Sequence, residues 1–169
     1  MTTRRLVLVR HAKAVTGDGD DGDRPLADRG VRDSPAIGRQ LADWVVVPDR
    51  VVVSPARRAK QTWELAARQL TGAPDPVFDE RVYRNTVDDL SAVVRSTPED
   101  VDTLAVVGHN PSIEEFGLAL DNGKGEARAR QTAADGYPTS AIAVFGIDVD
   151  WSQVAEGTGT LTAFAAPRG

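Results

Sequence analysis

Two stretches of the sequence decide the fold: RLVLVRH at residues 5–11 and TLAVVGH at residues 103–109. Each is a continuous apolar run that ends in a histidine, and such runs are typical of strands buried on both faces of a parallel sheet. A third run, RVVV at residues 50–53, has the same character and leads into SPARR. Patterns typical of helices separate the runs, so the sequence predicts an α/β fold with a mainly parallel sheet.

The spacing of apolar residues between these runs predicts four helices, over residues 28–46, 54–70, 86–97 and 110–120. Two late strands are expected at residues 141–147 and 160–165, and residues 74–77 are expected to form a loop or a short strand.

The sequence also predicts the buried face of the first helix and the residues at which the helices begin. In the first helix, Val31, Ile37, Leu41 and Val45 lie near one face. Pro35 either kinks that helix or marks a fresh start with Ser34 as its cap. The second helix is expected to open at Ser54-Pro55, the third to be capped by Thr86, and the fourth by Asn110.

Residues 121–138 are polar and glycine-rich and show no clear period. They carry Lys124, Arg128 and Arg130. This stretch is expected to be either a lid or docking loop, or a plain surface loop.

The chain has 169 residues, 41% of them hydrophobic and 27% charged, a balance typical of a globular protein. This length predicts one domain, residues 1–169. The early apolar run at residues 6–9 is far shorter than the roughly 20 residues of a membrane-spanning helix and too short for a signal-peptide core. The net charge of −5 argues against nucleic-acid binding. Cysteine is absent, and we expect a cytoplasmic protein without membrane contact.

The chain has only two histidines, His11 and His109, and each directly follows an apolar strand. Parallel α/β sheets bind ligands beyond the carboxyl ends of their strands, so both imidazoles are expected at one rim. Arg10 precedes the first histidine, and Arg57 and Arg58 follow the third apolar run. Cations gathered in this way repel one another unless an anion lies among them. Phosphate is the natural candidate, because the guanidinium fork matches its oxygens.

Other readings of these residues fit less well. A lone histidine after a strand is usually structural, but two at matching strand ends favour a shared site. Neither has a carboxylate at zinc-ligand spacing, and residues 18–23 (DGDDGD) break the calcium-loop pattern at Gly22. Residues 123–125 (GKG) lack the spacing of a P-loop, and no Gly-x-Ser-x-Gly elbow is present. We therefore expect a solvated loop at residues 18–23, no metal and no cofactor.

The same residues resemble the motifs of the histidine phosphatase superfamily, the phosphoglycerate-mutase-like enzymes. Residues 10–12 (RHA) are similar to its Arg-His-Gly opening, residues 54–62 (SPARRAKQT) to its Ser-x-x-x-Arg-Ala-x-Gln-Thr segment, and residues 108–110 (GHN) to its second-histidine motif. Residues 23–30 (DRPLADRG) and the short length most resemble SixA-type protein phosphohistidine phosphatases. The resemblance covers residues 5–120 and implies a three-layer α/β/α fold with a minimal cap.

The resemblance implies a role for each matched position. His11 would be the nucleophile, and His109 the second histidine of the phosphate pocket. Arg10 and Arg58 would bind the phosphoryl group, with Arg58 chosen because it directly precedes Ala-x-Gln-Thr. Glu80 resembles the general acid of the mutase branch, and an ordinary surface glutamate is the alternative for it.

Two departures from the family's pattern bear on the reaction. Ala12 replaces the usual glycine, so the backbone beside the phosphate has to accommodate a methyl group. The asparagine that mutase-type members carry shortly after the first histidine is absent, because Val15, Thr16 and Gly17 occupy that stretch. The missing asparagine counts against mutase activity more than against hydrolysis.

We therefore expect a metal-independent phosphatase that works through a covalent phosphohistidine at His11. Arg58 and His109 are separated by only 50 residues, which leaves little chain for a cap. An open site of this kind favours protein phosphohistidine as the substrate. The alternatives are a broad-specificity phosphomonoesterase for small molecules and a non-catalytic module that binds phosphate or phosphoproteins. The sequence does not indicate an oligomeric state.

Overall fold

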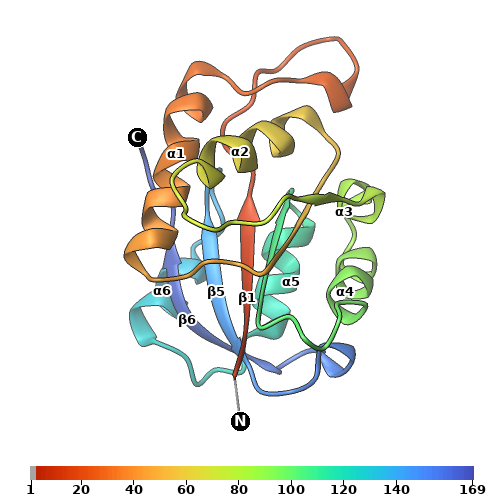
Figure 1. The fold of residues 1–169 in the computed structure, drawn as a ribbon, viewed down its shortest axis with the longest axis vertical. Coiled ribbons are helices and arrows are strands. Elements are labelled where there is room, and N and C mark those ends of the chain that lie inside the picture. The colour runs from red at the N-terminus through yellow and green to blue at the C-terminus, as the bar shows by residue number, and fades with distance from the viewer. Residues whose placement is uncertain (1–2) are drawn as a thin grey trace.

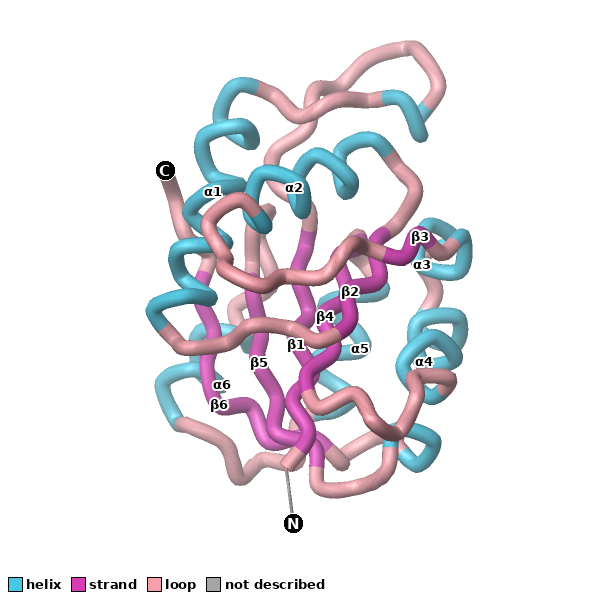
Figure 2. Tube along the Cα trace, viewed as in Figure 1, coloured by secondary structure: helices cyan, strands magenta, loops and turns pink. Residues whose placement is uncertain are grey.

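A computed structural model describes residues 3–169 and contains one six-stranded sheet between helices (Figures 1 and 2). The order of the strands is β3-β2-β4-β1-β5-β6. Strands β3, β2, β4 and β1 are parallel, and β5 runs antiparallel to both β1 and β6. The predicted mainly parallel sheet is confirmed. The strands are β1 (Arg4–Arg10), β2 (Arg50–Val53), β3 (Val77–Phe78), β4 (Thr103–Gly108), β5 (Ile142–Ile147) and β6 (Gly159–Ala165).

Helices cover both faces of this sheet. The α-helices are α1 (Asp28–Asp43), α2 (Arg57–Ala67), α3 (Glu80–Arg84), α4 (Val87–Arg95), α5 (Ser112–Leu120) and α6 (Ala127–Ala134). Two short 3-10 helices are η1 (Asp21–Asp23) and η2 (Trp151–Gln153). Among residues 3–169, no helix is long and apolar enough to span a membrane.

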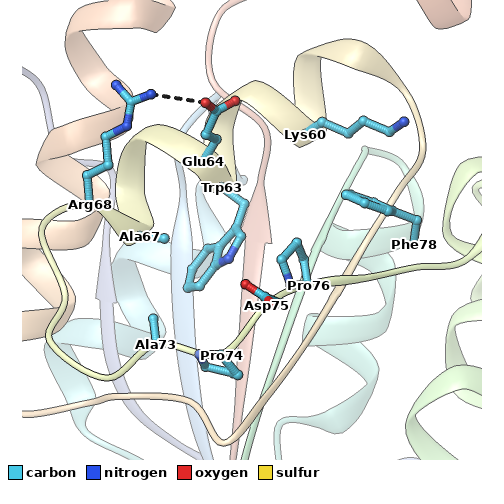
Figure 3. A pocket seen from close by; sticks show the side chains of 10 residues that line it. All are labelled: Lys60, Trp63, Glu64, Ala67, Arg68, Ala73, Pro74, Asp75, Pro76 and Phe78. Atoms are coloured by element: carbon cyan, nitrogen blue, oxygen red, sulfur yellow. Dashed lines mark hydrogen bonds and ion pairs between the residues drawn. The ribbon is translucent and has the colours of Figure 1, made fainter.

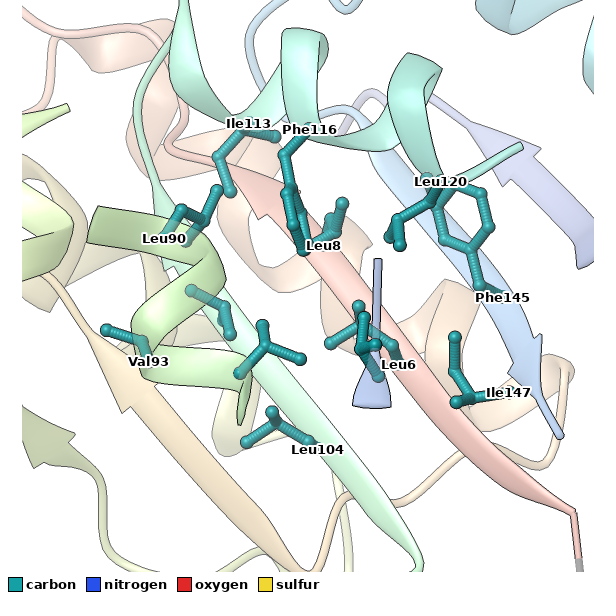
Figure 4. Packing of buried hydrophobic residues seen from close by; sticks show 14 of the residues in the cluster. Leu6, Leu8, Leu90, Val93, Leu104, Ile113, Phe116, Leu120, Phe145 and Ile147 are labelled. Carbon is teal, nitrogen blue, oxygen red and sulfur yellow. The ribbon is translucent and has the colours of Figure 1, made fainter. Parts of the chain in front are cut away.

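The alternation of side chains along β1 creates two hydrophobic cores and thereby the three layers. Leu6 and Leu8 point to the face covered by α4 and α5, where Phe116 packs on them (Figure 4). Val7 and Val9 point to the opposite face, which α1 and α2 cover. Each such side chain, when fully buried, stabilises the fold by about 1.5 to 3 kcal/mol. The continuous apolar run in the sequence reflects burial on both faces.

The first helix differs from the expectation in two ways. It runs without interruption through Pro35, and Ser34 lies inside it, where its hydroxyl donates to the Gly30 carbonyl at 2.7 Å. A fresh start at Ser34 is therefore wrong. Val31 is exposed, and so is Val45, which follows the end of the helix in a turn with a φ of 56°. Ile37 and Leu41 are fully buried, as the pattern predicted.

Two of the expected helix starts are also wrong. Helix α2 begins at Arg57, because the Ser54 hydroxyl is engaged by the Ala56 N–H and by His109. Helix α5 begins at Ser112, and the Asn110 side chain does not cap it. The predicted cap of α4 is confirmed, since the Thr86 hydroxyl accepts the backbone N–H of Asp89.

Two short helices were missed by the apolar pattern. Helix α6 lies inside residues 121–138 and is capped by Glu126, whose carboxylate accepts the N–H groups of Arg128 and Ala129. Its core-facing residues are the alanines Ala129 and Ala133, so it shows no stripe of large apolar residues. Helix α3 is only five residues long and begins after Asp79, which caps it.

Gly38 of α1 packs against α2 with no room for a side chain, because a Cβ there would overlap the carbonyl oxygen of Ala66. We expect Gly38→Ala to lower the free energy of unfolding by about 1 to 3 kcal/mol, as overpacking does, despite alanine's higher helix propensity. Denaturant titration followed by circular dichroism measures this change. Gly19→Ala is the control, because nothing lies within 4 Å of its added methyl group. Equal losses in both variants would contradict the close contact between the helices.

Candidate functional site

The parallel pairing of β1 with β4 brings the two histidines together. Arg10 lies opposite Gly108 in the register, so the next residue of each strand is a histidine. The His11 N–H donates to the Gly108 carbonyl at 3.0 Å and extends the pairing by one residue. The ring centroids of His11 and His109 are 5.2 Å apart, with the planes tilted by 59°. Both imidazoles thus share one pocket at the carboxyl rim of the sheet.

The ring of His11 is fixed in one tautomer. Its Nδ1 lies 2.7 Å from the carbonyl oxygen of Ala12, and because a carbonyl only accepts, Nδ1 carries the proton. The lone pair is therefore on Nε2. The pKa of His11 is lowered to about 4, chiefly by burial and also by the charges of Arg58 and Arg10, while the hydrogen bond to the Ala12 carbonyl opposes these effects. At neutral pH, His11 is an uncharged ring with a free Nε2 lone pair.

The surroundings of His109 favour the opposite tautomer. The Ser54 hydroxyl accepts the Ala56 N–H at 3.2 Å, so its own proton is available to His109 Nε2 at 2.7 Å. The Nδ1 of His109 then carries a proton, and it has no acceptor among residues 3–169. Burial, followed by the proximity of His11, lowers the pKa of His109 to about 3. His109 is thus a neutral hydrogen-bond donor.

Helix α2 brings the predicted arginine to the same pocket. Arg58 is buried, at 6% exposure, whereas Arg57 lies on the outer face of the helix. The Arg58 carbonyl accepts from the Thr62 hydroxyl at 2.7 Å, and that hydroxyl accepts the Ala12 N–H at 3.0 Å. The Arg-Ala-x-Gln-Thr segment therefore ties α2 to the backbone beside His11.

Arg10 is held by the segment that precedes β5. Its Nη1 donates to the Tyr137 carbonyl at 2.8 Å, and the Asn110 side chain donates to the same oxygen at 3.0 Å. This contact explains why Asn110 does not cap α5. Burial lowers the pKa of Arg10, and the nearby carboxylate of Glu114 opposes that effect.

Most of the buried side-chain nitrogen and oxygen atoms that lack a hydrogen-bond partner within residues 3–169 lie in this pocket. They are Arg10 Nε, Arg58 Nε, His109 Nδ1, Asn110 Oδ1 and Ser140 Oγ. Each buried donor left without a partner costs about 1 to 3 kcal/mol. Three of these atoms are nitrogen donors, so a bound oxyanion would satisfy them.

Asp21 is the residue at this site that the sequence did not predict. It belongs to the loop after β1, which passes above α2 at the top of the view in Figure 1, and was expected to be solvated. Its backbone carbonyl accepts from Arg58 Nη1 at 2.8 Å and its carboxylate from Nη2 at 3.1 Å. The same carboxylate accepts from Arg24 and from the hydroxyl of Tyr83.

Glu80 is the exposed first residue of α3 and lines a shallow hollow with Asp20 and Tyr83. Neither histidine lines this hollow, and neither do Arg10 and Arg58. The ring of Tyr83 packs edge-on against His109 at 5.8 Å between centroids. Tyr83 thus lines the hollow and also contacts the histidine pocket.

A larger groove lies on another part of the surface, between α2 and residues 73–78 (Figure 3). The Trp63 indole points from α2 towards Pro74 and Pro76, and Lys60 lies over the ring of Phe78 at 4.7 Å. Neither histidine lines this groove, and neither do Arg10 and Arg58. The groove is therefore separate from the candidate site at the rim of the sheet.

The burial of both imidazoles predicts that they stay neutral well into acid. In NMR titrations, in which the two rings are the only histidine signals, we expect midpoints near pH 4 for His11 and near 3 for His109. Both midpoints lie below the ordinary histidine pKa of 6.5. At a pH between these midpoints and 6.5, the unfolded chain therefore binds more protons than the folded chain. The free energy of unfolding should therefore fall as the pH drops from about 6.5 to 4. A midpoint near 6.5 for either ring would contradict the buried arrangement.

Relatives of similar length match this chain. An uncharacterised protein of Mycobacterium tuberculosis (strain H37Rv) is 35% identical over 163 residues, covering 95% of this chain and 100% of the relative. A Nakamurella multipartitia protein assigned as a phosphohistidine phosphatase SixA has a TM-score of 0.85 at 29% identity, covering 98% of this chain and 96% of that one. The protein histidine phosphatase SixA complexed with tungstate has a TM-score of 0.77 at 27% identity, covering 96% and 97%.

These matches confirm the expected phosphoglycerate-mutase-like fold and the resemblance to SixA-type proteins. The sequence profile of the histidine phosphatase superfamily (branch 1) matches residues 6–115, well over half of the chain. The chain therefore belongs to the histidine phosphatase superfamily, whose members are hydrolases that use a histidine nucleophile.

Proposed function

We propose that this chain is a metal-independent phosphatase that forms a covalent phosphohistidine at His11 and acts on protein phosphohistidine in the cytoplasm. The proposal rests on one observation: unpartnered buried donors of Arg10, Arg58 and His109 surround a neutral imidazole. Three such donors match the three terminal oxygens of a phosphoryl group.

In the first step, Nε2 of His11 attacks phosphorus, and the bond between phosphorus and the leaving group breaks. His11 becomes positively charged, and its Nδ1 proton stays hydrogen-bonded to the Ala12 carbonyl. Charge in such a transition state lies on the phosphoryl oxygens, so positioned cations supply most of the stabilisation. Arg10 and Arg58 carry that charge here, which is why the mechanism needs no metal.

In the second step, water attacks the phosphohistidine. The bond between Nε2 and phosphorus breaks, inorganic phosphate leaves, and His11 returns to its neutral form. Glu80 would protonate an alkoxide leaving group in the first step and accept a proton from the water in the second. The hollow that it lines supports this role, because Tyr83 lines the same hollow and contacts His109. An imidazole leaving group needs this acid less, because the phosphorus–nitrogen bond is already weak.

The shape of the site supports a protein substrate. Between Arg58 and His109 the chain forms the rest of α2, the two-residue strand β3, the short helices α3 and α4 and the strand β4, and it adds no cap domain. Glu80 and Tyr83 border a shallow, open hollow. A phosphorylated side chain on a protein surface fits such a site better than a small sugar phosphate that needs enclosure. The solved SixA relatives support the same substrate class.

The first test is hydrolysis of a chromogenic aryl phosphate, and of a phosphohistidine protein, in the presence of a metal chelator. We expect turnover by the wild-type chain and none above background by His11→Ala. Arg58→Ala should lose about a hundredfold or more in kcat, as removal of one transition-state donor typically does. Arg57→Ala, an exposed neighbour with the same charge, is the matched control and should keep the wild-type rate.

Three outcomes would count against the proposal. Turnover that disappears in the chelator and returns with added magnesium would contradict a metal-independent mechanism. Oxyanion binding without turnover of either substrate would favour the binding module instead. Selective, saturable turnover of small phosphates without action on phosphohistidine would replace the protein substrate by a small one.

The role of Glu80 predicts a graded effect on different substrates. Glu80→Gln should reduce hydrolysis of an alkyl phosphomonoester by about 100-fold or more, because general acid catalysis of a poor leaving group is lost. Hydrolysis of phosphohistidine should change much less. Comparison of kcat/KM for both substrates measures the difference, and Glu64→Gln, an exposed change on α2, controls for the loss of charge. Equal losses on both substrates would refute an acid role for Glu80.

A further inference from the structure

Asp21 contacts Arg58 through two different groups. The Asp21 carbonyl accepts from Arg58 Nη1 at 2.8 Å, and its carboxylate Oδ2 accepts from Nη2 at 3.1 Å. The carboxylate in turn is fixed by three further hydrogen bonds, one from the Tyr83 hydroxyl at 2.7 Å and two from Arg24 at 2.9 and 3.1 Å. Arg58 is therefore held by a loop that is itself anchored to α3.

The position of these contacts on the guanidinium is informative. A guanidinium has two edges at which a pair of N–H groups point in parallel: the end formed by Nη1 and Nη2, and the side formed by Nε and Nη2. Asp21 occupies the end. Nε of Arg58 is buried and has no partner in the described part of the chain, so no residue there occupies the side edge through Nε. That edge is suited to bidentate binding of a phosphoryl oxygen pair.

We propose that Asp21 is a positioning residue that clamps the end of the Arg58 guanidinium and thereby presents its Nε–Nη2 edge to the phosphoryl group. This inference rests on the proposed function, since it assigns Arg58 to the phosphoryl group. Arg58 carries a long side chain with several rotatable bonds, and without the clamp its guanidinium loses a fixed orientation.

The Tyr83 hydrogen bond, together with Arg24 and Arg58, holds the pKa of Asp21 far below its usual range. The carboxylate is therefore charged at neutral pH.

Simple electrostatics predicts the opposite effect for removal of Asp21. A carboxylate next to the pocket repels an incoming oxyanion and competes with it for Arg58. If this were the main effect of Asp21, its removal would tighten anion binding. The clamp predicts weaker binding when Asp21 is lost. The sign of the change in affinity therefore separates the two roles.

The test uses tungstate as the probe and follows binding to the full-length 15N-labelled protein by NMR, which measures weak affinities and reports the integrity of the fold in the same spectra. We expect Asp21→Asn to raise the dissociation constant for tungstate about tenfold or more, because misplacement of a binding group by about 1 Å can cost on the order of 100-fold. Tyr83→Phe keeps the ring beside His109 and removes only one bond to Asp21, so its effect should be smaller.

Asp23→Asn is the matched control. Asp23 lies in the same short helix as Asp21, is exposed, and makes no side-chain hydrogen bond or ion pair with residues 3–169. Because a solvated charge is largely screened, this variant should bind tungstate within about twofold of the wild type. It removes the same charge from the same loop without touching Arg58.

A double-mutant cycle distinguishes a clamp from general support of the fold. In an Arg58→Ala background, Asp21→Asn should cause no further loss of tungstate affinity, because the group that it orients is gone. An equal loss in both backgrounds, or tighter binding by Asp21→Asn than by the wild type, would overturn the proposal.

The outcomes for the clamp and for the phosphatase are separable. Absence of turnover by the wild-type chain would refute the proposed reaction. The tungstate measurements would still test whether Asp21 positions Arg58 for oxyanion binding. A phosphatase in which Asp21→Asn behaves like Asp23→Asn would keep its reaction and lose the clamp.

Discussion

The parallel pairing of β1 with β4 is the constraint on which the site depends. Because Arg10 faces Gly108 across the pair, the chain delivers His11 and His109 at the same height on adjacent strands. Gly108 is part of this constraint, since a Cβ at that position would lie 2.8 Å from the side chain of Val82 in α3. A slip by one residue would turn every side chain of β1 to the other face, and the two cores of the molecule would oppose it. The positions of the histidines are therefore fixed by packing far from the chemistry.

Repulsion between like charges at this rim is limited, because burial keeps the two imidazoles neutral. With the two pKa values lowered to about 4 and about 3, neither histidine adds to the positive charge of Arg10 and Arg58 at neutral pH. Each arginine is anchored by one end, Arg10 on the Tyr137 carbonyl and Arg58 on Asp21, and each keeps a buried Nε without a partner. The pocket thus combines cations that are already oriented with donors that lack acceptors. An arriving phosphoryl group meets groups that need little reorganisation, which is the condition for electrostatic catalysis.

The sequence predicted those parts of the structure that depend on local pattern. Continuous apolar runs indicated β1, β2 and β4, and the histidine after two of them indicated the rim. The choice of Arg58 over Arg57 came from the family motif, and the burial of Arg58 agrees with it.

The failures concern contacts between distant residues. Asn110 resembled a helix cap by its position, yet its side chain binds the carbonyl of Tyr137, 27 positions away. Residues 18–21 are solvent-exposed as expected, but the contact between Asp21 and Arg58, 37 positions away, was not predicted. Helix α6 was missed for a different reason, because it buries only alanines and so lacks a visible stripe. The contacts of Asn110 and Asp21 are tertiary, and one sequence carries no signal of them.

The different hydrogen-bond partners of the two histidines give chemically identical side chains different roles. The Ala12 carbonyl can only accept, so it forces the proton of His11 onto Nδ1 and leaves a lone pair on Nε2. Ser54 can donate to Nε2 of His109, which places the proton of that ring on Nδ1 and makes it a donor. A nucleophile and a donor to the phosphoryl oxygens are therefore distinguished before any substrate arrives. The two histidines cannot simply exchange these roles. His109 could attack phosphorus through Nε2 only after losing its hydrogen bond to Ser54. His11 could donate to a phosphoryl oxygen from Nδ1 only after releasing the Ala12 carbonyl.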